Sequence, residues 1–180
     1  MSIFEVGVIG TGRLGGALAL ALSRKGYRIK QLIGRDREKA RQLADSIFPH
    51  PEVLSANSFE EISVDLLFIA TQDSEIQPVA EKLASELEQM PFVYHTSGSR
   101  SADSLNALRE GGYDVASFHP LVSVSDAKTG ADAFDGAYFC LDGDPEALKI
   151  ARIIVGDLGG KAFSIDSKQK ALYHASAVLA

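Results

Sequence analysis

The stretch GVIGTGRLGGALA, residues 7–19, decides the fold of this 180-residue chain. It starts as a short apolar run, turns at three spaced glycines, and continues as a segment rich in Ala and Leu that predicts a helix ending before Gly26. The glycines Gly10, Gly12 and Gly15 fit the spacing G-x-G-x-x-G. When a strand precedes that spacing and a helix follows it, the pattern indicates a loop that binds the pyrophosphate of a dinucleotide.

Each glycine of this loop has its own physical purpose. Gly10 permits the tight turn, Gly12 lets a pyrophosphate approach the backbone, and Gly15 lets helix and strand pack closely. The start of the helix supplies N–H groups and the positive end of a dipole. The alternative is a glycine-rich turn without a ligand. The cofactor-binding residues predicted for the loop are Gly10, Thr11, Gly12, Arg13, Leu14 and Gly15.

Apolar runs of strand length alternate with amphipathic segments of helix length along most of the chain. Predicted strands cover residues 4–9, 27–33, 64–70, 92–94, 115–118, 137–141 and 162–165. Predicted helices cover residues 14–25, 36–48 and 145–158, and another begins at a cap of Asp73 or Ser74 and includes Leu87. Repeated strand–helix–strand units predict an α/β fold for residues 1–165: a doubly wound, mostly parallel Rossmann-like sheet with helices on both faces.

The last segment, residues 166–180, departs from this alternation. It predicts a helix, capped by Asp166 or Ser167, with apolar or small residues around most of its circumference. Such a helix should be buried, and we expect the surface that buries it to come from outside residues 1–180. We therefore expect the first helix of a helical domain whose remainder is absent, or a helix that packs against a partner subunit.

Composition excludes several classes of partner. The net charge is −6, from 18 basic and 24 acidic residues, and no run of Lys and Arg offers the basic face that nucleic acid requires. No apolar run reaches the ~18 residues of a membrane span. A single cysteine precludes an internal disulfide framework and is typical of a reducing cytoplasm. We expect a cytoplasmic protein with a small-molecule substrate and no nucleic-acid or membrane partner.

The choice of cofactor depends on residues about 20 positions after the loop. An acidic side chain there binds the ribose 2′-OH of NAD, but this chain has Gly34 followed by Arg35. A guanidinium suits a 2′-phosphate, so we predict NADP rather than NAD. The alternative for Arg35 is a solvated loop arginine, and Asp36 could bind a ribose hydroxyl or cap the next helix. A methyltransferase that uses S-adenosylmethionine expects an acidic residue after the second strand, which Gly34 and Arg35 do not supply.

Polar residues follow three further predicted strands, at the edge where a doubly wound sheet binds its ligand. Thr71 and Gln72 suit a cofactor ribose or nicotinamide, and Ser97 and Ser99 offer hydroxyl groups. His119 precedes a proline, which stiffens its loop and would hold the imidazole in place. A backbone-bonded loop histidine is the alternative for His119.

The final predicted helix contains a second pair of candidates. Lys170 and His174 are spaced i and i+4, so a cation and a titratable imidazole lie on one helix face. The alternative is a solvated lysine beside an unrelated histidine.

These motifs together resemble a known family. The chain contains, in order, GVIGTGRLGGALA, Thr71-Gln72-Asp73, HTSGS (95–99), SFHPL (117–121) and KALYHASAVLA (170–180). It resembles the Rossmann-like NAD(P)-binding proteins with an uncharacterised helical C-terminal domain, the domain of unknown function numbered 2520. Those proteins are similar to pyrroline-5-carboxylate reductase, the β-hydroxyacid dehydrogenases and prephenate dehydrogenase.

The resemblance implies an NADP-binding domain followed by a helical domain that dimerises and closes the active site. By position, Lys170 resembles the catalytic lysine of β-hydroxyacid dehydrogenases, and His174 replaces an asparagine that binds substrate. The His-Pro turn is similar to one in prephenate dehydrogenases, which suggests that His119 faces the substrate.

We therefore expect an NADP-dependent oxidoreductase, or its cofactor-binding portion, that transfers a hydride between nicotinamide and a small carbonyl, hydroxyl or imine compound. Lys170 would be the general acid or base, assisted by His174, with Ser97, Ser99 and His119 orienting the substrate. Ser97 is also predicted to bind the cofactor. The alternative is a non-catalytic NADP-binding sensor or scaffold. Either protein would be a homodimer through its C-terminal helical region.

Overall fold

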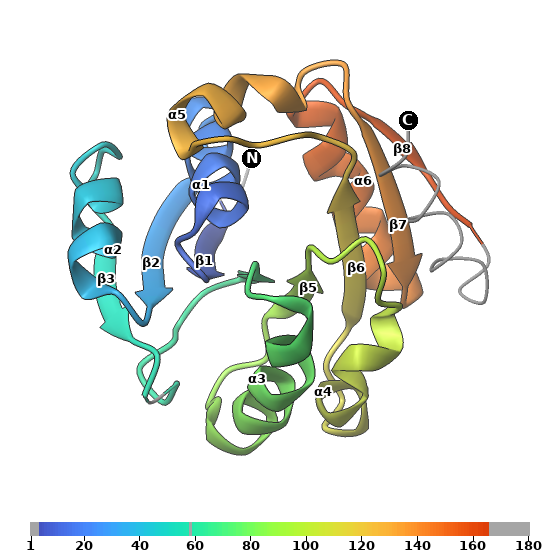
Figure 1. Cartoon of the computed structure of the whole chain (residues 1–180). Coiled ribbons are helices and arrows are strands. Elements are labelled where there is room, and N and C mark those ends of the chain that lie inside the picture. The colour runs from blue at the N-terminus through green and yellow to red at the C-terminus, as the bar shows by residue number, and fades with distance from the viewer. Residues whose placement is uncertain (1–3, 58, 166–180) are drawn as a thin grey trace.

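The computed structural model describes residues 4–57 and 59–165. The predicted helix over 166–180 therefore lies outside the described residues. Eight strands form one sheet in the order β3-β2-β1-β4-β5-β6-β7-β8 (Figure 1). The strands are β1 (Glu5–Ile9), β2 (Arg28–Gly34), β3 (Glu52–Ser55), β4 (Leu66–Ile69), β5 (Phe92–His95), β6 (Val115–Pro120), β7 (Tyr138–Gly143) and β8 (Lys161–Phe163).

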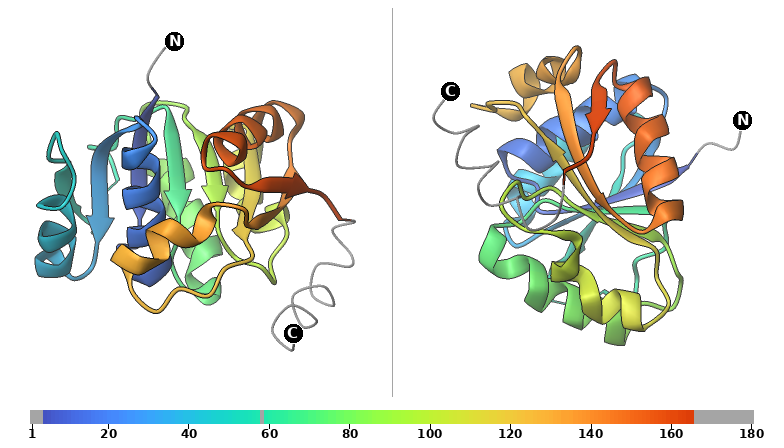
Figure 2. Two further views of the ribbon diagram at one scale, coloured as in Figure 1. Left: turned by 90° about the horizontal axis from the view of Figure 1, so that it is seen from above. Right: turned by 90° about the vertical axis from the view of Figure 1, so that its right-hand side faces the viewer.

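Helices cover both faces of this sheet, as the repeated strand–helix–strand units predict (Figure 2). The first face carries α1 (Arg13–Arg24), α2 (Arg37–Ala44) and α6 (Pro145–Asp157), and the second carries α3 (Asp73–Glu86) and α4 (Asn106–Glu110). Short elements complete the described chain: α5 (Ala127–Gly130) and the 3-10 turns η1 (Ala102–Leu105) and η2 (Ala131–Phe134). The predicted doubly wound α/β Rossmann-like fold is confirmed. None of the described helices is long and apolar enough to cross a membrane.

One strand pair departs from the parallel pattern of the repeated units. β6 and β7 are antiparallel, with Phe118 opposite Leu141. The segment between them, which contains α5 and η2, starts and ends at the same edge of the sheet, so β7 must run back. α5 then packs on α1, where a Cβ atom at Gly16 would lie 2.9 Å from the Cβ of Ala127.

The predicted end of one helix is wrong and one strand was not predicted, both for local reasons. α2 has the expected cap, because Asp36 accepts a hydrogen bond from the Lys39 N–H at 3.1 Å, but it ends at Ala44 rather than near residue 48. Bonds of the tighter i→i+3 type close its last turn, and the proline at 49 disfavours helix before it. β3 was not predicted, because four residues with two polar ends carry no periodic signal.

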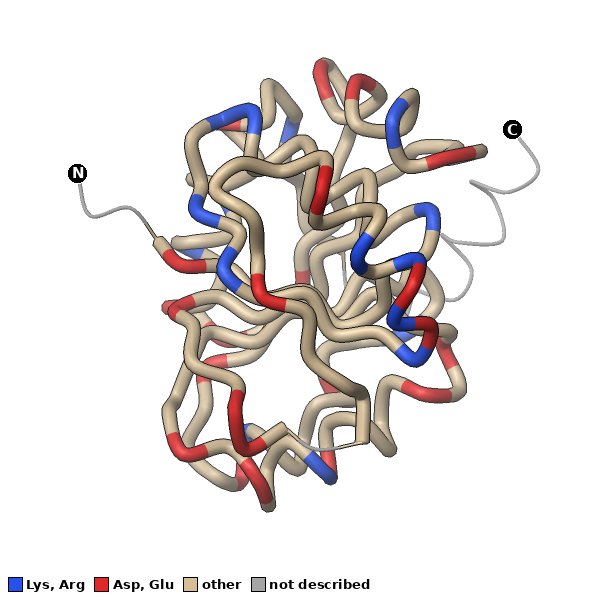
Figure 3. The backbone as a smooth tube through the Cα atoms, turned by 90° about the vertical axis from the view of Figure 1, so that its left-hand side faces the viewer, with Lys and Arg blue, Asp and Glu red and all other residues tan. Residues whose placement is uncertain are grey.

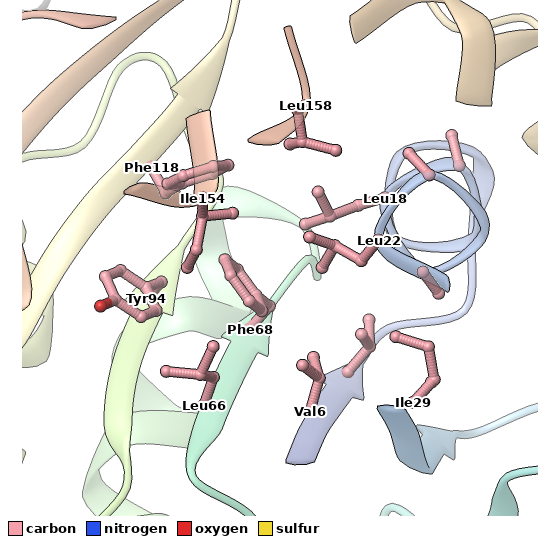
Figure 4. Packing of buried hydrophobic residues seen from close by; sticks show 14 of the residues in the cluster. Val6, Leu18, Leu22, Ile29, Leu66, Phe68, Tyr94, Phe118, Ile154 and Leu158 are labelled. Carbon is pink, nitrogen blue, oxygen red and sulfur yellow. The ribbon is translucent and has the colours of Figure 1, made fainter. Parts of the chain in front are cut away.

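The first face of the sheet packs its core around a row of aromatic rings (Figure 4). Phe68 stacks on Tyr94 at 5.0 Å between centroids, and Phe118 contacts Phe68 at 5.4 Å and Phe139 at 5.1 Å. The Tyr94 hydroxyl donates to the Ala147 carbonyl of α6 at 3.0 Å. Burial raises the pKa of the Tyr94 phenol above its ordinary value, so this donor keeps its proton. The row joins β4, β5, β6 and β7 into one core.

The approach of α1 to the sheet depends on Gly15. A Cβ atom at this position would lie 1.9 Å from the Gly10 carbonyl oxygen and 2.9 Å from the Ala70 Cβ. No rotation of a side chain relieves a clash with backbone. We expect Gly15→Ala to lower the free energy of unfolding by about 2 kcal/mol or more, measured by denaturant titration.

Gly156 provides the matched control for this substitution. It lies inside α6, where a Cβ atom would meet no described atom within 4 Å. Gly156→Ala should raise the free energy of unfolding by roughly 0.5–1 kcal/mol, because alanine loses less backbone entropy in a helix. Equal stability of Gly15→Ala and the unmodified chain would contradict the close approach.

Candidate functional site

A cavity of about 590 Å³ opens at the carboxyl ends of β1, β2 and β4. Strand order reverses between β1 and β4, and ligands of open α/β sheets bind at such a switch point. Six of the residues predicted to bind the cofactor line this cavity: Gly10, Thr11, Gly12, Arg35, Thr71 and Gln72. The structure therefore brings together residues that are up to 62 positions apart in the sequence.

The glycine loop forms one wall of the cavity. Gly10 has φ +96°, and a Cβ atom there would lie 2.6 Å from the Ala70 carbonyl oxygen, so only glycine fits the turn. The Gly10 N–H donates to Ile33 at 2.8 Å, which ties the loop to β2. A Cβ atom at Gly12 would instead contact no described atom within 4 Å. The loop is closely packed at its start and open at its second glycine.

The start of α1 faces this open position. Gly12 is the N-cap, no described side chain caps the first turn, and that turn contains no acidic residue. Its N–H groups belong to Arg13, Leu14 and Gly15, so these predicted residues offer backbone donors without lining the cavity. Uncapped N–H groups and the helix dipole favour an anion at this place.

Charges of both signs surround the cavity mouth. The Arg35 side chain is 73% exposed, and its Nη1 lies 2.7 Å from Oε1 of Glu75 in the first turn of α3. In the adjoining start of α2, Lys39 Nζ lies 3.7 Å from the Asp36 carboxylate. Basic and acidic residues also lie close together along the backbone of α2 (Figure 3). The cavity mouth is therefore not uniformly basic.

The far end of the cavity contains residues that the sequence did not single out. Lys82 of α3 lies with its Nζ 5.0 Å from the centre of the Phe59 ring and donates to the Asn57 carbonyl oxygen. Phe59 follows β3, the strand that was not predicted. Lys82 has the spacing of a solvated helix residue, so no pattern in the sequence could have placed it here.

The loop after β5 is held together by its own side chains. His95 is fully buried; its Nδ1 accepts from the Ser97 N–H at 3.2 Å, and its Nε2 lies 2.9 Å from the Ser101 carbonyl oxygen. The Ser97 hydroxyl accepts from the N–H groups of Ser99 and Arg100 at 3.3 and 3.2 Å. Both ring nitrogens of His95 thus bond the backbone of its own loop, and the residue is buried and structural. Ser97 orders this loop and does not line the cavity.

A hydrogen bond links the loop after β5 to the start of α3. The Ser99 hydroxyl donates to Asp73 at 2.5 Å. Asp73 does not cap α3 as expected, because the N-cap is Gln72. The Gln72 side chain makes no capping bond. Ser74 does not cap α3 either, because it lies inside the helix.

His119 lies further along the same edge of the sheet. Its Nδ1 is 3.1 Å from the Thr96 carbonyl oxygen, and since a carbonyl only accepts, Nδ1 donates. In the neutral ring Nε2 is then the nitrogen that accepts. Ile69, His95 and Ser117 lie side by side in neighbouring strands, and His119 lies two residues beyond Ser117 along β6. His119 does not line the cavity. The remaining catalytic candidates, Lys170 and His174, lie outside the described residues.

Two similar solved structures share this fold. A Bacteroides fragilis protein assigned as an NADP oxidoreductase is 25% identical, with 98% of this chain and 66% of that chain covered and a TM-score of 0.80. The Aquifex aeolicus prephenate dehydrogenase, in complex with hydroxyphenyl propionate and NAD+, is 22% identical, with 94% and 62% covered and a TM-score of 0.76. The chain thus spans less than two thirds of the length of either protein.

A curated relative and two family models also match. The Sulfolobus acidocaldarius glutamyl-tRNA reductase is 28% identical over 109 residues, which are 59% of this chain and 26% of that protein. The model for a domain of unknown function (DUF2520) matches residues 137–180, which confirms the resemblance drawn from the motifs. The model for the Rossmann-like domain matches residues 2–120. Because that match covers more than half of the chain, the protein belongs to the Rossmann-like domain family.

Proposed function

We propose that this domain binds NADP in the 590 Å³ cavity and is the cofactor-binding part of an oxidoreductase. The substrate class is a small carbonyl, hydroxyl or imine compound. One observation carries the proposal: the uncapped start of α1 faces the cavity behind Gly12, whose missing side chain leaves open space. The similar Bacteroides fragilis protein, assigned as an NADP oxidoreductase, supports it.

The residues around the cavity fit a dinucleotide phosphate. Backbone donors of the first turn of α1 would hold the pyrophosphate, and Arg35 would pair with the 2′-phosphate. Thr71 and Gln72, after β4, would contact the ribose or nicotinamide side. The nicotinamide supplies hydride chemistry when it is bound.

The protein's own part in the reaction is proton transfer and substrate orientation. His119 would orient the substrate, because its Nδ1 donates to the Thr96 carbonyl oxygen and this bond holds the imidazole at the carboxyl end of β6. The position of Lys170 in the motif KALYHASAVLA supports its assignment as the general acid or base, with His174 and Ser97 as auxiliary groups.

A non-catalytic NADP sensor or scaffold is the second candidate function. It is favoured by the observation that neither Ser97 nor His119 lines the cavity in the described part of the chain. A sensor should change its oligomeric state on binding NADP, measured by light scattering, and should leave a panel of carbonyl and imine compounds unreacted. We propose that either protein is a homodimer through its C-terminal helical region.

Calorimetric titration tests the choice of cofactor. We expect NADPH to bind at least tenfold more tightly than NADH, a difference of about 1.4 kcal/mol. Arg35→Gln should remove most of this difference by weakening NADPH alone. Arg41→Gln, which removes the same charge from α2 away from the cavity, is the control. Equal affinities in the unmodified chain would contradict the NADP preference, and no binding of either would contradict the site.

Gly12→Val tests the phosphate loop itself. A Cβ atom at this position would meet no neighbouring protein atom within 4 Å, so the domain should fold with nearly unchanged stability. It would occupy the space assigned to the pyrophosphate, and we expect NADPH affinity to fall by tenfold or more in the same titration. Gly156→Val is the matched control. Unaltered NADPH affinity in Gly12→Val would rule out pyrophosphate binding at the loop.

Lys170→Met tests the proposal that the protein is an enzyme in which Lys170 transfers a proton. If Lys170 transfers the proton, turnover of a substrate found in the panel should fall by ~10²-fold or more. NADPH affinity should stay the same, since the cavity residues are unchanged. Undiminished turnover would exclude Lys170 as the general acid or base.

A further inference from the structure

The cavity mouth contains an ion pair that opposes phosphate binding, because its carboxylate already occupies the cation that a phosphate would need. Arg35 comes from the end of β2 and Glu75 from the first turn of α3, two elements on opposite sides of the cavity. Their side chains meet at 2.7 Å, and both residues line the cavity. The guanidinium assigned to the 2′-phosphate is therefore already paired with a carboxylate.

The neighbouring cations do not offer an equal substitute. Lys39 lies 3.7 Å from Asp36, and Lys82 lies 3.8 Å from Glu86 while donating to a backbone carbonyl. Arg35 is the group with the fork geometry that matches a phosphate. A phosphate that binds Arg35 must displace Glu75 or share the guanidinium with it. The phosphate and the Glu75 carboxylate are both negatively charged, so they repel each other.

We infer that Glu75 is a specificity-determining residue that limits the preference of this site for a 2′-phosphorylated cofactor. This inference rests on the proposed NADP site. The Glu75 carboxylate competes with the 2′-phosphate for Arg35 and repels it through space. A cofactor with a neutral 2′-hydroxyl meets neither cost. Glu75 thus reduces the difference in binding affinity between NADP and NAD that Arg35 alone would create.

The position of Glu75 gives a reason for a carboxylate here even without a ligand. Acidic residues in the first turn of a helix are stabilised by the helix dipole, and α3 has Asp73 and Glu75 there. Side-chain exposure of 31% for Glu75 and 73% for Arg35 means that solvent screens their attraction. The pair is therefore weak enough for a ligand to exchange.

Glu75→Gln is the decisive variant, with Glu81→Gln as its matched control. Glu81 lies on the same helix, bonded to Gln77 at 3.0 Å and away from the cavity, and its substitution changes the net charge equally. Adenosine 2′,5′-bisphosphate and AMP are the probes, because they differ only in the 2′-phosphate. We expect Glu75→Gln to bind the bisphosphate about fivefold more tightly, with AMP affinity unchanged. Glu81→Gln should alter neither.

The same substitution in an Arg35→Gln background separates competition from simple repulsion. Without the guanidinium only repulsion remains, so the gain from Glu75→Gln should be smaller than in the unmodified chain. High salt should reduce the gain further, because the groups are exposed. An equal gain in both backgrounds would overturn competition for Arg35.

The outcomes separate this inference from the function on which it rests. If the unmodified chain binds the bisphosphate but Glu75→Gln binds it no better, Glu75 serves only α3 and the inference is wrong. If the unmodified chain binds neither probe and neither NADPH nor NADH, both the inference and the proposed site are overturned. A lower melting temperature of Glu75→Gln with unchanged affinity would identify the purely structural role.

Discussion

The contact between α1 and the sheet at Gly15 is the constraint on which the site depends. With a Cβ atom only 1.9 Å from the Gly10 carbonyl oxygen, any other residue would push the helix away from β1 and β4. That movement would turn the first-turn N–H groups away from the cavity and open the tight turn at Gly10. One missing side chain thus sets the distance between a helix dipole and the space that a ligand would fill.

Electrostatics at the cavity are divided between backbone and side chains. The α1 terminus has no acid in its first turn and is positive by geometry alone, whereas the first turn of α3 carries Asp73 and Glu75. Two helix starts of unlike character therefore meet at one cavity, although the whole chain has a net charge of −6. Local placement of a few charges matters more for an anionic ligand than the overall balance.

The sequence was informative wherever a short-range rule applied. Glycine spacing and apolar periodicity predicted the loop, the central strands and the two helix layers, and the Asp36 cap followed from local chemistry. The sequence did not predict features that depend on how distant segments pack together. β3 is too short for a periodic signal, and the reversal at β7 depends on how α5 packs. Glu75 and Lys82 look like solvated helix residues, because nothing local shows that β2 ends opposite them.

The aromatic row from Phe68 to Phe139 crosses four strands, and the Tyr94 hydrogen bond adds α6. Because these links join the centre of the sheet, we expect it to unfold as one unit, with amide protons that exchange mainly through global unfolding. β3 and β8, at the two edges, lack a neighbour on one side among the described strands and open locally at lower cost. Because β3 leads into Phe59 at the cavity wall, a bound ligand would slow hydrogen exchange most at this edge, several strands away from Ser97 and His119.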